Sequence, residues 1–145
     1  MATGRDRRHD IANYLSQSTR NRLVFCHAPI ERLTFANIGV ALSAALKTED
    51  LRSPLIAYTA EDILGELMSS YHTDALIGSY VAIENIGILF EPNLGFNLKS
   101  LFDNYSRERV LIICSEGTIH NHCFYFYQDG DGYAIDLKDL SYIEI

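Results

Sequence analysis

Glu84 and Asn85 are the residues whose types and position best suggest chemistry, because they directly follow the apolar run YVAI at 80–83. In nucleotide-hydrolysing folds, a carboxylate at the end of a buried strand holds a magnesium ion. Such a site also needs a glycine-rich loop, whose bare backbone N–H groups bind phosphate, and a lysine that contacts the outer phosphates. The value of Glu84 as a magnesium ligand therefore depends on whether the chain carries that loop.

The segment after the first strand-like run, RLVFC at 22–26, does not contain a phosphate-binding loop. It reads HAPIERLT, with Leu33 where the lysine would stand, Thr34 at the one matching position, and no glycine before Gly39. An equally good interpretation has the loop and its helix missing, with RLTFAN as the second strand. We expect no nucleotide cofactor and no catalytic residue. The simpler role for Glu84 is to end its strand and accept hydrogen bonds from backbone N–H groups.

Cysteine and histidine residues also invite a metal or nucleophile hypothesis. HNHC at 120–123 could supply zinc ligands together with Cys114 or Cys26, but its spacing is not that of a known zinc finger. Neighbouring strand residues point to opposite faces, so Cys26 and His27 are not expected to form a thiol–imidazole pair. We therefore expect neither a metal site nor a nucleophile.

The bulk properties predict a single domain over 1–145, with a basic N-terminal helix or tail at 1–21 and the core at 22–145. Apolar residues make up 48% of the 145 residues and charged residues 21%, which is typical of a globular protein. No apolar run approaches the roughly 20 residues that span a bilayer, so we expect no membrane contact. Three cysteines, an odd number, favour reduced thiols and a cytoplasmic location.

The formal net charge of −7 is unevenly distributed. Residues 1–22 hold five arginines against Asp6 and Asp10, a local charge of +3, which leaves −10 on the remainder. An acidic body repels phosphate backbones, so direct nucleic-acid binding is disfavoured. The arginines remain a candidate contact for DNA or an acidic partner, although a solvated tail and first helix is the simpler explanation.

Apolar runs that alternate with helical periodicity predict a three-layer α/β fold with a mostly parallel sheet. Asn37, Thr59 and Asn97 are the expected helix N-caps. A C-terminal antiparallel hairpin, HCFYFYQDGDGYAIDL, is expected to extend the sheet. The remaining elements are helices at 10–18, 37–47, 59–70 and 97–108, and strands at 22–26, 33–36, 80–84, 109–115 and 141–145.

Aromatic residues near the C-terminus suggest a surface for a partner. Four consecutive rings, Phe124, Tyr125, Phe126 and Tyr127, are joined by Tyr133 and Tyr142 on neighbouring strands. Alternation sends only half of a strand's side chains inward, and the last strand, SYIEI, leaves an open edge. We therefore expect a protein interface here. Two alternatives are a second, smaller core beneath a helix and a platform on which single-stranded bases stack.

Residues 81–117, VAIENIGILFEPNLGFNLKSLFDNYSRERVLIICSEG, carry a more specific pattern. Its parts are a strand ending in Glu84 and Asn85, the segment Ile88–Pro92, the helix positions Leu98 and Leu101, the pair Arg107 and Arg109, and Ser115 at a strand end. This pattern, with FANIGVALSAAL and the tyrosine-rich tail, resembles the BrxF family, small P-loop-type accessory proteins of bacteriophage exclusion (BREX) defence systems. The resemblance runs from about Arg22 to the C-terminus.

The resemblance implies a degenerate P-loop NTPase-type fold, since the family's phosphate loop is absent here. Glu84 and Asn85 would be a remnant of the magnesium-binding pair, and Ser115 the polar residue of the next strand end. The implied function is a non-catalytic accessory subunit that binds protein subunits of the same bacterial defence system; a homo-oligomer is compatible with this. The alternatives are a divergent ATPase that uses Glu84, and a nucleic-acid-contacting regulatory module.

Overall fold

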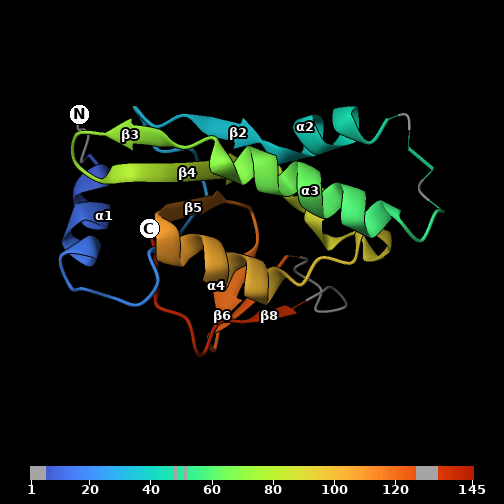
Figure 1. Ribbon diagram of the computed structural model, residues 1–145. Coiled ribbons are helices and arrows are strands. Elements are labelled where there is room, and N and C mark those ends of the chain that lie inside the picture. The colour runs from blue at the N-terminus through green and yellow to red at the C-terminus, as the bar shows by residue number, and fades with distance from the viewer. Residues whose placement is uncertain (1–5, 48, 51, 127–133) are drawn as a thin grey trace.

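The computed structural model describes residues 6–47, 49, 50, 52–126 and 134–145. Its main feature is a sheet in which five parallel strands follow the order β2-β4-β5-β1-β9, with β3 antiparallel to β4 (Figure 1). The strands are β1 (Leu23–Cys26), β2 (Phe35–Asn37), β3 (His72–Asp74), β4 (Gly78–Glu84), β5 (Val110–Cys114) and β9 (Tyr142–Glu144). The predicted α/β class with a mostly parallel sheet is confirmed.

Within the described ranges the helices are α1 (Arg8–Leu15), α2 (Ile38–Ala45), α3 (Ile56–Ser69), α4 (Leu98–Glu108) and the short 3-10 helices η1 (Gly87–Phe90) and η2 (Pro92–Leu94). Two predicted N-caps are confirmed, since Asn37 accepts a hydrogen bond from Val40 N–H and Asn97 accepts one from Ser100 N–H. The third is wrong. Helix α3 begins before Thr59, whose hydroxyl donates to the Leu55 carbonyl inside the helix.

Strand residues alternate between two buried clusters, one on each face of the sheet. On one face, Phe25, Ile83 and Ile113 pack with helices α2, α3 and α4. On the other, Val24 and Ile112 pack with α1 and with the loop at 27–34. Figure 1 shows α3 and α4 lying over the same face.

The crossover from β1 to β2 passes β5 and β4 without a helix. Parallel strands are usually joined by a helical crossover, so this short link is unusual. The loop instead buries Ile30 and half-buries Leu33 against the sheet. The interpretation in which RLTFAN supplies the second strand therefore agrees with the structure, although β2 begins at Phe35, two residues later than predicted.

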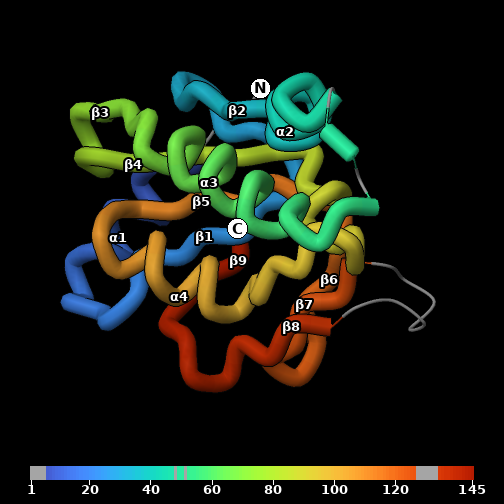
Figure 2. The backbone as a smooth tube through the Cα atoms, turned by 45° about the vertical axis from the view of Figure 1, so that its right-hand side comes forward, coloured from blue at the N-terminus to red at the C-terminus, as the bar shows by residue number. Residues whose placement is uncertain are grey.

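The C-terminal aromatic segment forms a separate antiparallel sheet, β6 (Thr118–His120), β7 (Cys123–Tyr125) and β8 (Ala134–Asp136). The expectation that the hairpin extends the large sheet is wrong, because β9 occupies the place beside β1 and Phe124 packs onto Phe25 from the sheet face. Figure 2 shows β6–β8 well apart from α1. The segment QDGDG, where an Asp-Gly turn was expected to join the two strands of the hairpin, lies outside the described residues. Strands β3 and β6 were missed from the sequence.

Candidate functional site

The carboxyl ends of β1, β4 and β5 border a crevice of about 630 Å³. Open α/β sheets bind ligands in the crevice beyond the carboxyl ends of their strands. His27, Glu84 and Ser115, each at or just beyond the end of its strand, line it. The structure thus brings Ser115 together with the pair Glu84 and Asn85, which the sequence had placed at the end of another strand.

Glu84 is half-buried, and its carboxylate has no hydrogen bond or ion pair with any other residue in the part of the chain that the structure describes. The expectation that it accepts backbone N–H bonds is therefore wrong. Its negative charge helps to raise the pKa of Cys114, although burial is the larger cause. An unpaired carboxylate at the end of a central strand is available to a cation or another hydrogen-bond donor.

Asn85 has a structural explanation that the sequence did not reveal. Its φ of 54° lies in the left-handed region, which asparagine adopts more readily than most residues. Its amide Nδ2 donates a 2.8 Å hydrogen bond to Asn37 Oδ1, the atom that also caps α2. Gly39 leaves room for this amide. Asn85 therefore turns the chain out of β4 and fixes it to the start of α2.

Ser115 is used mainly to shape the turn after β5. Its N–H donates to the Cys26 carbonyl at 2.9 Å, and its hydroxyl accepts a hydrogen bond from Gly117 N–H at 3.1 Å. A Cβ at Gly117 would lie 2.6 Å from the Tyr125 carbonyl oxygen. Glycine is therefore needed where the chain enters the small sheet.

Cys26 and Cys114 are register partners on β1 and β5, and both side chains are buried on the α1 face. Burial raises the pKa of Cys26 to about 12, with a smaller contribution from the neighbouring Cys114 thiol. Burial also raises the pKa of Cys114. Both thiols therefore stay protonated at neutral pH and are poor nucleophiles.

Positive charge is scarce around the crevice. His27 Nε2 lies 3.2 Å from the Glu144 carboxylate, and Glu116 adds a second acid to the lining. Arg7, at the start of α1, donates to the carbonyls of Ala28 and Pro29 and so ties the loop to α1. The crevice can hold a cation or a hydrogen-bond donor, whereas a phosphate group would meet two carboxylates.

Three further arginines of the N-terminal segment make contacts within the described part of the chain. Arg8 is 7% exposed and pairs with Asp6 and Asp74. Arg20 pairs with Asp103, and Arg22 donates to the Arg107 carbonyl. Arg5 lies outside the described residues and the Arg20 side chain is 55% exposed, so a nucleic-acid contact through this segment stays a hypothesis.

The HNHC segment contacts the last strand of the large sheet. His122 Nδ1 lies 2.9 Å from the Tyr142 hydroxyl. Among the residues that the structure describes, no three His, Cys, Asp or Glu side chains form a group able to hold an ion.

The predicted aromatic interface divides into buried and half-buried members. Phe124 is 2% exposed and stacks on Phe25 with ring centroids 5.3 Å apart, so it belongs to the main core and not to a second, smaller one. Phe126 stacks on Phe90 at 4.6 Å. Tyr125 and Tyr142 are half-buried, while Tyr127 and Tyr133 lie outside the described residues.

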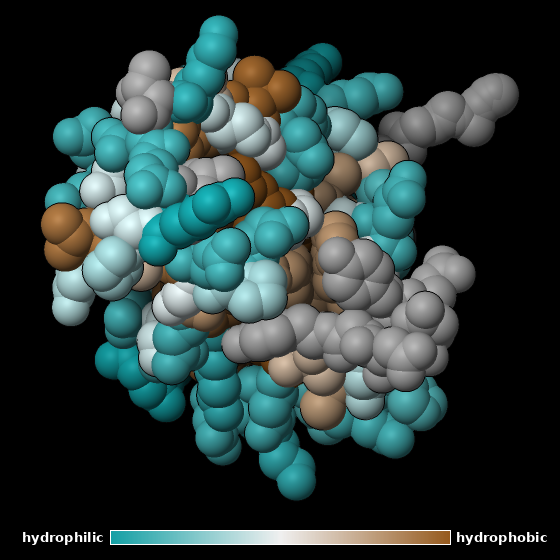
Figure 3. Space-filling view, turned by 90° about the vertical axis from the view of Figure 1, so that its right-hand side faces the viewer, coloured by the Kyte–Doolittle hydropathy of each residue, from teal (hydrophilic) through white to brown (hydrophobic). Residues whose placement is uncertain are grey.

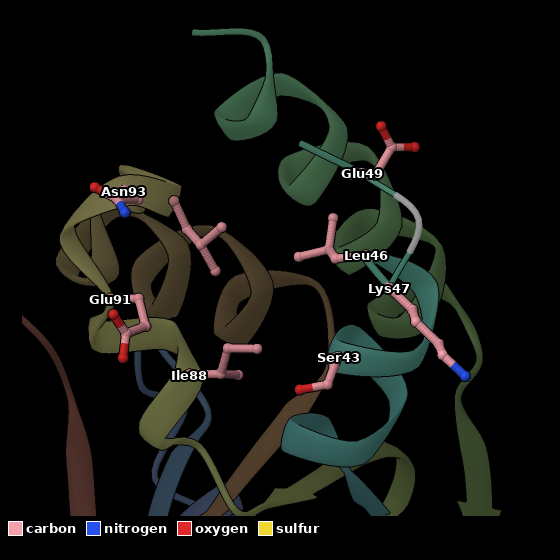
Figure 4. A pocket seen from close by; sticks show the side chains of 8 residues that line it. Ser43, Leu46, Lys47, Glu49, Ile88, Glu91 and Asn93 are labelled. Atoms are coloured by element: carbon pink, nitrogen blue, oxygen red, sulfur yellow. The ribbon is translucent and has the colours of Figure 1, made fainter. Parts of the chain in front are cut away.

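Two further hollows lie beside the crevice, between α2 and the 3-10 helices, and the sequence gave no signal for them. Figure 4 shows the outer one, with Ser43 and Leu46 on α2 and its C-cap facing Ile88 on η1. Shared lining residues connect these hollows to each other and to the crevice.

In the described part of the chain, no helix is both long and apolar enough to cross a membrane. Comparison with protein-family models, with curated proteins and with solved structures found no match to this chain.

Proposed function

We propose that this chain is a non-catalytic accessory subunit of a bacterial anti-phage defence system and acts through protein contacts. Its fold is, in this proposal, a degenerate P-loop type in which the phosphate-binding loop and its helix have been lost. The partners are protein subunits of the same system. The family part of the proposal rests on the resemblance to BrxF that residues 81–117 carry.

The observation that carries the non-catalytic part is the crossover from β1 to β2. Where a nucleotide-hydrolysing fold places a glycine-rich loop and the N-terminus of a helix, residues 27–34 run without glycine or helix. The loop is held against the sheet by Ile30 and by Arg7. A phosphate group would therefore find neither bare N–H groups nor a lysine, and it would face Glu84 and Glu116.

The test combines nucleotide titration with partner capture. We expect calorimetry with ATP and magnesium to show no binding and a phosphate-release assay to show no turnover. Micromolar affinity for ATP, or turnover that disappears in Glu84→Gln, would overturn the non-catalytic assignment in favour of a divergent ATPase. We also expect the tagged full chain, co-expressed with the genes that neighbour its own, to co-purify with a defence subunit. Recovery of the chain alone would contradict the accessory role.

A further inference from the structure

The crevice at the strand ends continues into a groove along α2. Asn85 borders both the crevice and the adjoining hollow. Ser43, Ile88 and Glu91 in turn border both that hollow and the outer one shown in Figure 4. We call this continuous depression, from Glu84 past α2 and η1, the α2 groove.

The α2 groove is strongly acidic. Its carboxylates are Glu49, Glu84, Glu91 and Glu116. Within the ranges that the structure describes, none of the four makes a hydrogen bond or an ion pair through its side chain. Lys47 is the only lysine or arginine among the described lining residues, and Figure 4 shows its ammonium group directed away from the hollow. His27 is already paired with Glu144.

An apolar strip runs beside these acids. Val40 on α2 is 62% exposed, Ile88 is half-buried, and Leu46 and Leu94 close the floor. Figure 3 shows this end of the molecule, where apolar side chains reach the surface among hydrophilic ones. Asn85 is exposed, and its oxygen Oδ1 has no hydrogen-bond partner among the residues described. An amide oxygen in that position can accept a hydrogen bond from the backbone of a bound chain.

We propose that the α2 groove binds an extended, lysine- or arginine-rich segment of a partner protein. Side chains alternate along an extended segment, so one set can reach the carboxylates while small apolar residues of the other set contact Val40 and Ile88. Glu84 then pairs with a cationic side chain of the partner, and Asn85 Oδ1 accepts a backbone N–H. Nucleic acids and acidic segments are excluded by the same carboxylates. The inference rests on the proposed function only in that the occupant is a partner protein.

The probe is a short fluorescein-labelled peptide in which lysine alternates with valine and serine, followed by fluorescence anisotropy against the full-length chain. We expect binding that weakens as salt is added, and no binding of the matched peptide with glutamate in place of lysine. Equal binding of both peptides, or no binding of the lysine peptide at low salt, overturns the proposal.

Matched charge variants distinguish binding by the carboxylates of the α2 groove from attraction to the net negative charge of the whole chain. Glu84→Gln with Glu91→Gln is expected to raise the Kd by roughly tenfold. Asp62→Asn with Glu66→Gln changes the net charge equally on exposed positions of α3 and is expected to leave the Kd within about twofold. An equal effect of the two pairs overturns the proposal. Ser43→Arg, a surface change on α2 that needs no repacking, should abolish binding by blocking the groove.

Capture of the natural partner distinguishes this proposal from the proposed function. A partner that co-purifies with the parent chain but not with the Glu84→Gln, Glu91→Gln variant supports both. A partner whose capture is indifferent to the variant overturns the groove and leaves the accessory role standing. Peptide binding in the groove without any co-purifying defence subunit overturns the accessory role and supports the groove.

Discussion

The side-chain amide of Asn85 donates a 2.8 Å hydrogen bond to Oδ1 of Asn37, the cap of helix α2. One contact thus joins the end of β4 to the start of α2 and sets the border between the crevice and the rest of the α2 groove. Gly39 is part of this contact, because a Cβ at that position would lie 2.3 Å from Asn85 Nδ2. The positions of Asn37, Gly39 and Asn85 therefore depend on one another.

A double-mutant cycle measures the energetic coupling between Gly39 and Asn85. Alanine normally stabilises a helix relative to glycine by about 1 kcal/mol, but Gly39→Ala should instead destabilise the chain by about 1–3 kcal/mol because its Cβ displaces the Asn85 amide. In an Asn85→Gly background the amide is gone and the φ of 54° is tolerated, so most of that cost should disappear. Urea unfolding of the four proteins measures the coupling. Additive effects would show that the predicted clash is relieved elsewhere.

Sequence reasoning succeeded where the information is local. The buried strands around Val24, Ile83 and Ile112 were identified by their apolar runs, and Asn37 and Asn97 were identified as caps by residue type and position. Each of these features depends on neighbours within a few residues along the chain.

Features that depend on distant partners were not predicted. The small sheet packs on the face of the large one because Phe124 stacks on Phe25, a contact between residues far apart in the sequence. The left-handed backbone of Asn85 and the groove along α2 arise only when β4 and α2 are brought together. Glu84, Asn85 and Ser115 were found as candidates, but the absence of a hydrogen-bond partner for the Glu84 side chain within the described residues could not have been read from the sequence.

The second prediction concerns acid stability at Arg8, whose guanidinium lies 2.7 Å from Asp74 Oδ1 and 2.8 Å from Asp6 Oδ2. The hydrogen bond from Arg8 lowers the pKa of Asp6 to about 2. Burial tends to raise the pKa of Asp74, but hydrogen bonds from Arg8, Leu76 N–H and Ile77 N–H together lower it. Both carboxyls bind protons more weakly in the folded chain than in the unfolded one. Their stabilisation is therefore present above the ordinary pKa of 3.8 and is lost as the pH falls through the folded-state pKa.

Removing one of these carboxylates should therefore make the free energy of unfolding less dependent on pH in the acid range. In Asp74→Asn, we expect the free energy of unfolding to decrease less steeply between about pH 5 and pH 2 than in the parent chain. Urea unfolding at several pH values measures this slope. Asp62→Asn, at an exposed position on α3, is the control and should leave the slope unchanged. Parallel curves for Asp74→Asn and the parent would refute the coupling.

The third prediction is that the three cysteines differ in reactivity. Burial raises the pKa of Cys26 to about 12 and also raises that of Cys114, whereas Cys123 is half-buried on the small sheet. Titration of the native chain with a thiol reagent near pH 8 should give one fast equivalent, lost in Cys123→Ser, and two slow ones. In the chain unfolded with guanidinium, all three thiols should react with the reagent at the same rate. Fast reaction of Cys26 in the native state would contradict the burial argument.

The last prediction concerns the open edge of β9, which pairs with β1 on one side. Ile145 N–H donates to the Phe25 carbonyl, so Ile143 also faces β1, and alternation turns the N–H groups of Tyr142 and Glu144 toward the open edge. Exposed edges favour strand addition by another chain. Tyr142 of the predicted interface lies on β9 itself, and its hydroxyl is 2.9 Å from His122 Nδ1.

A proline substitution can block the pairing of another strand with the edge of β9 without unfolding the chain. Glu144→Pro removes an N–H that the large sheet does not use, so the fold should survive with a loss of about 1 kcal/mol or less, including the lost contact with His27. If a second copy or a partner adds to β9, the variant should lose that assembly in light scattering and partner capture. Ile143→Pro removes an N–H that pairs with β1 and should unfold the edge strand, which makes it the matched control. Assembly that persists in a folded Glu144→Pro variant would exclude this edge and leave Tyr125→Ser as the change that tests the aromatic surface.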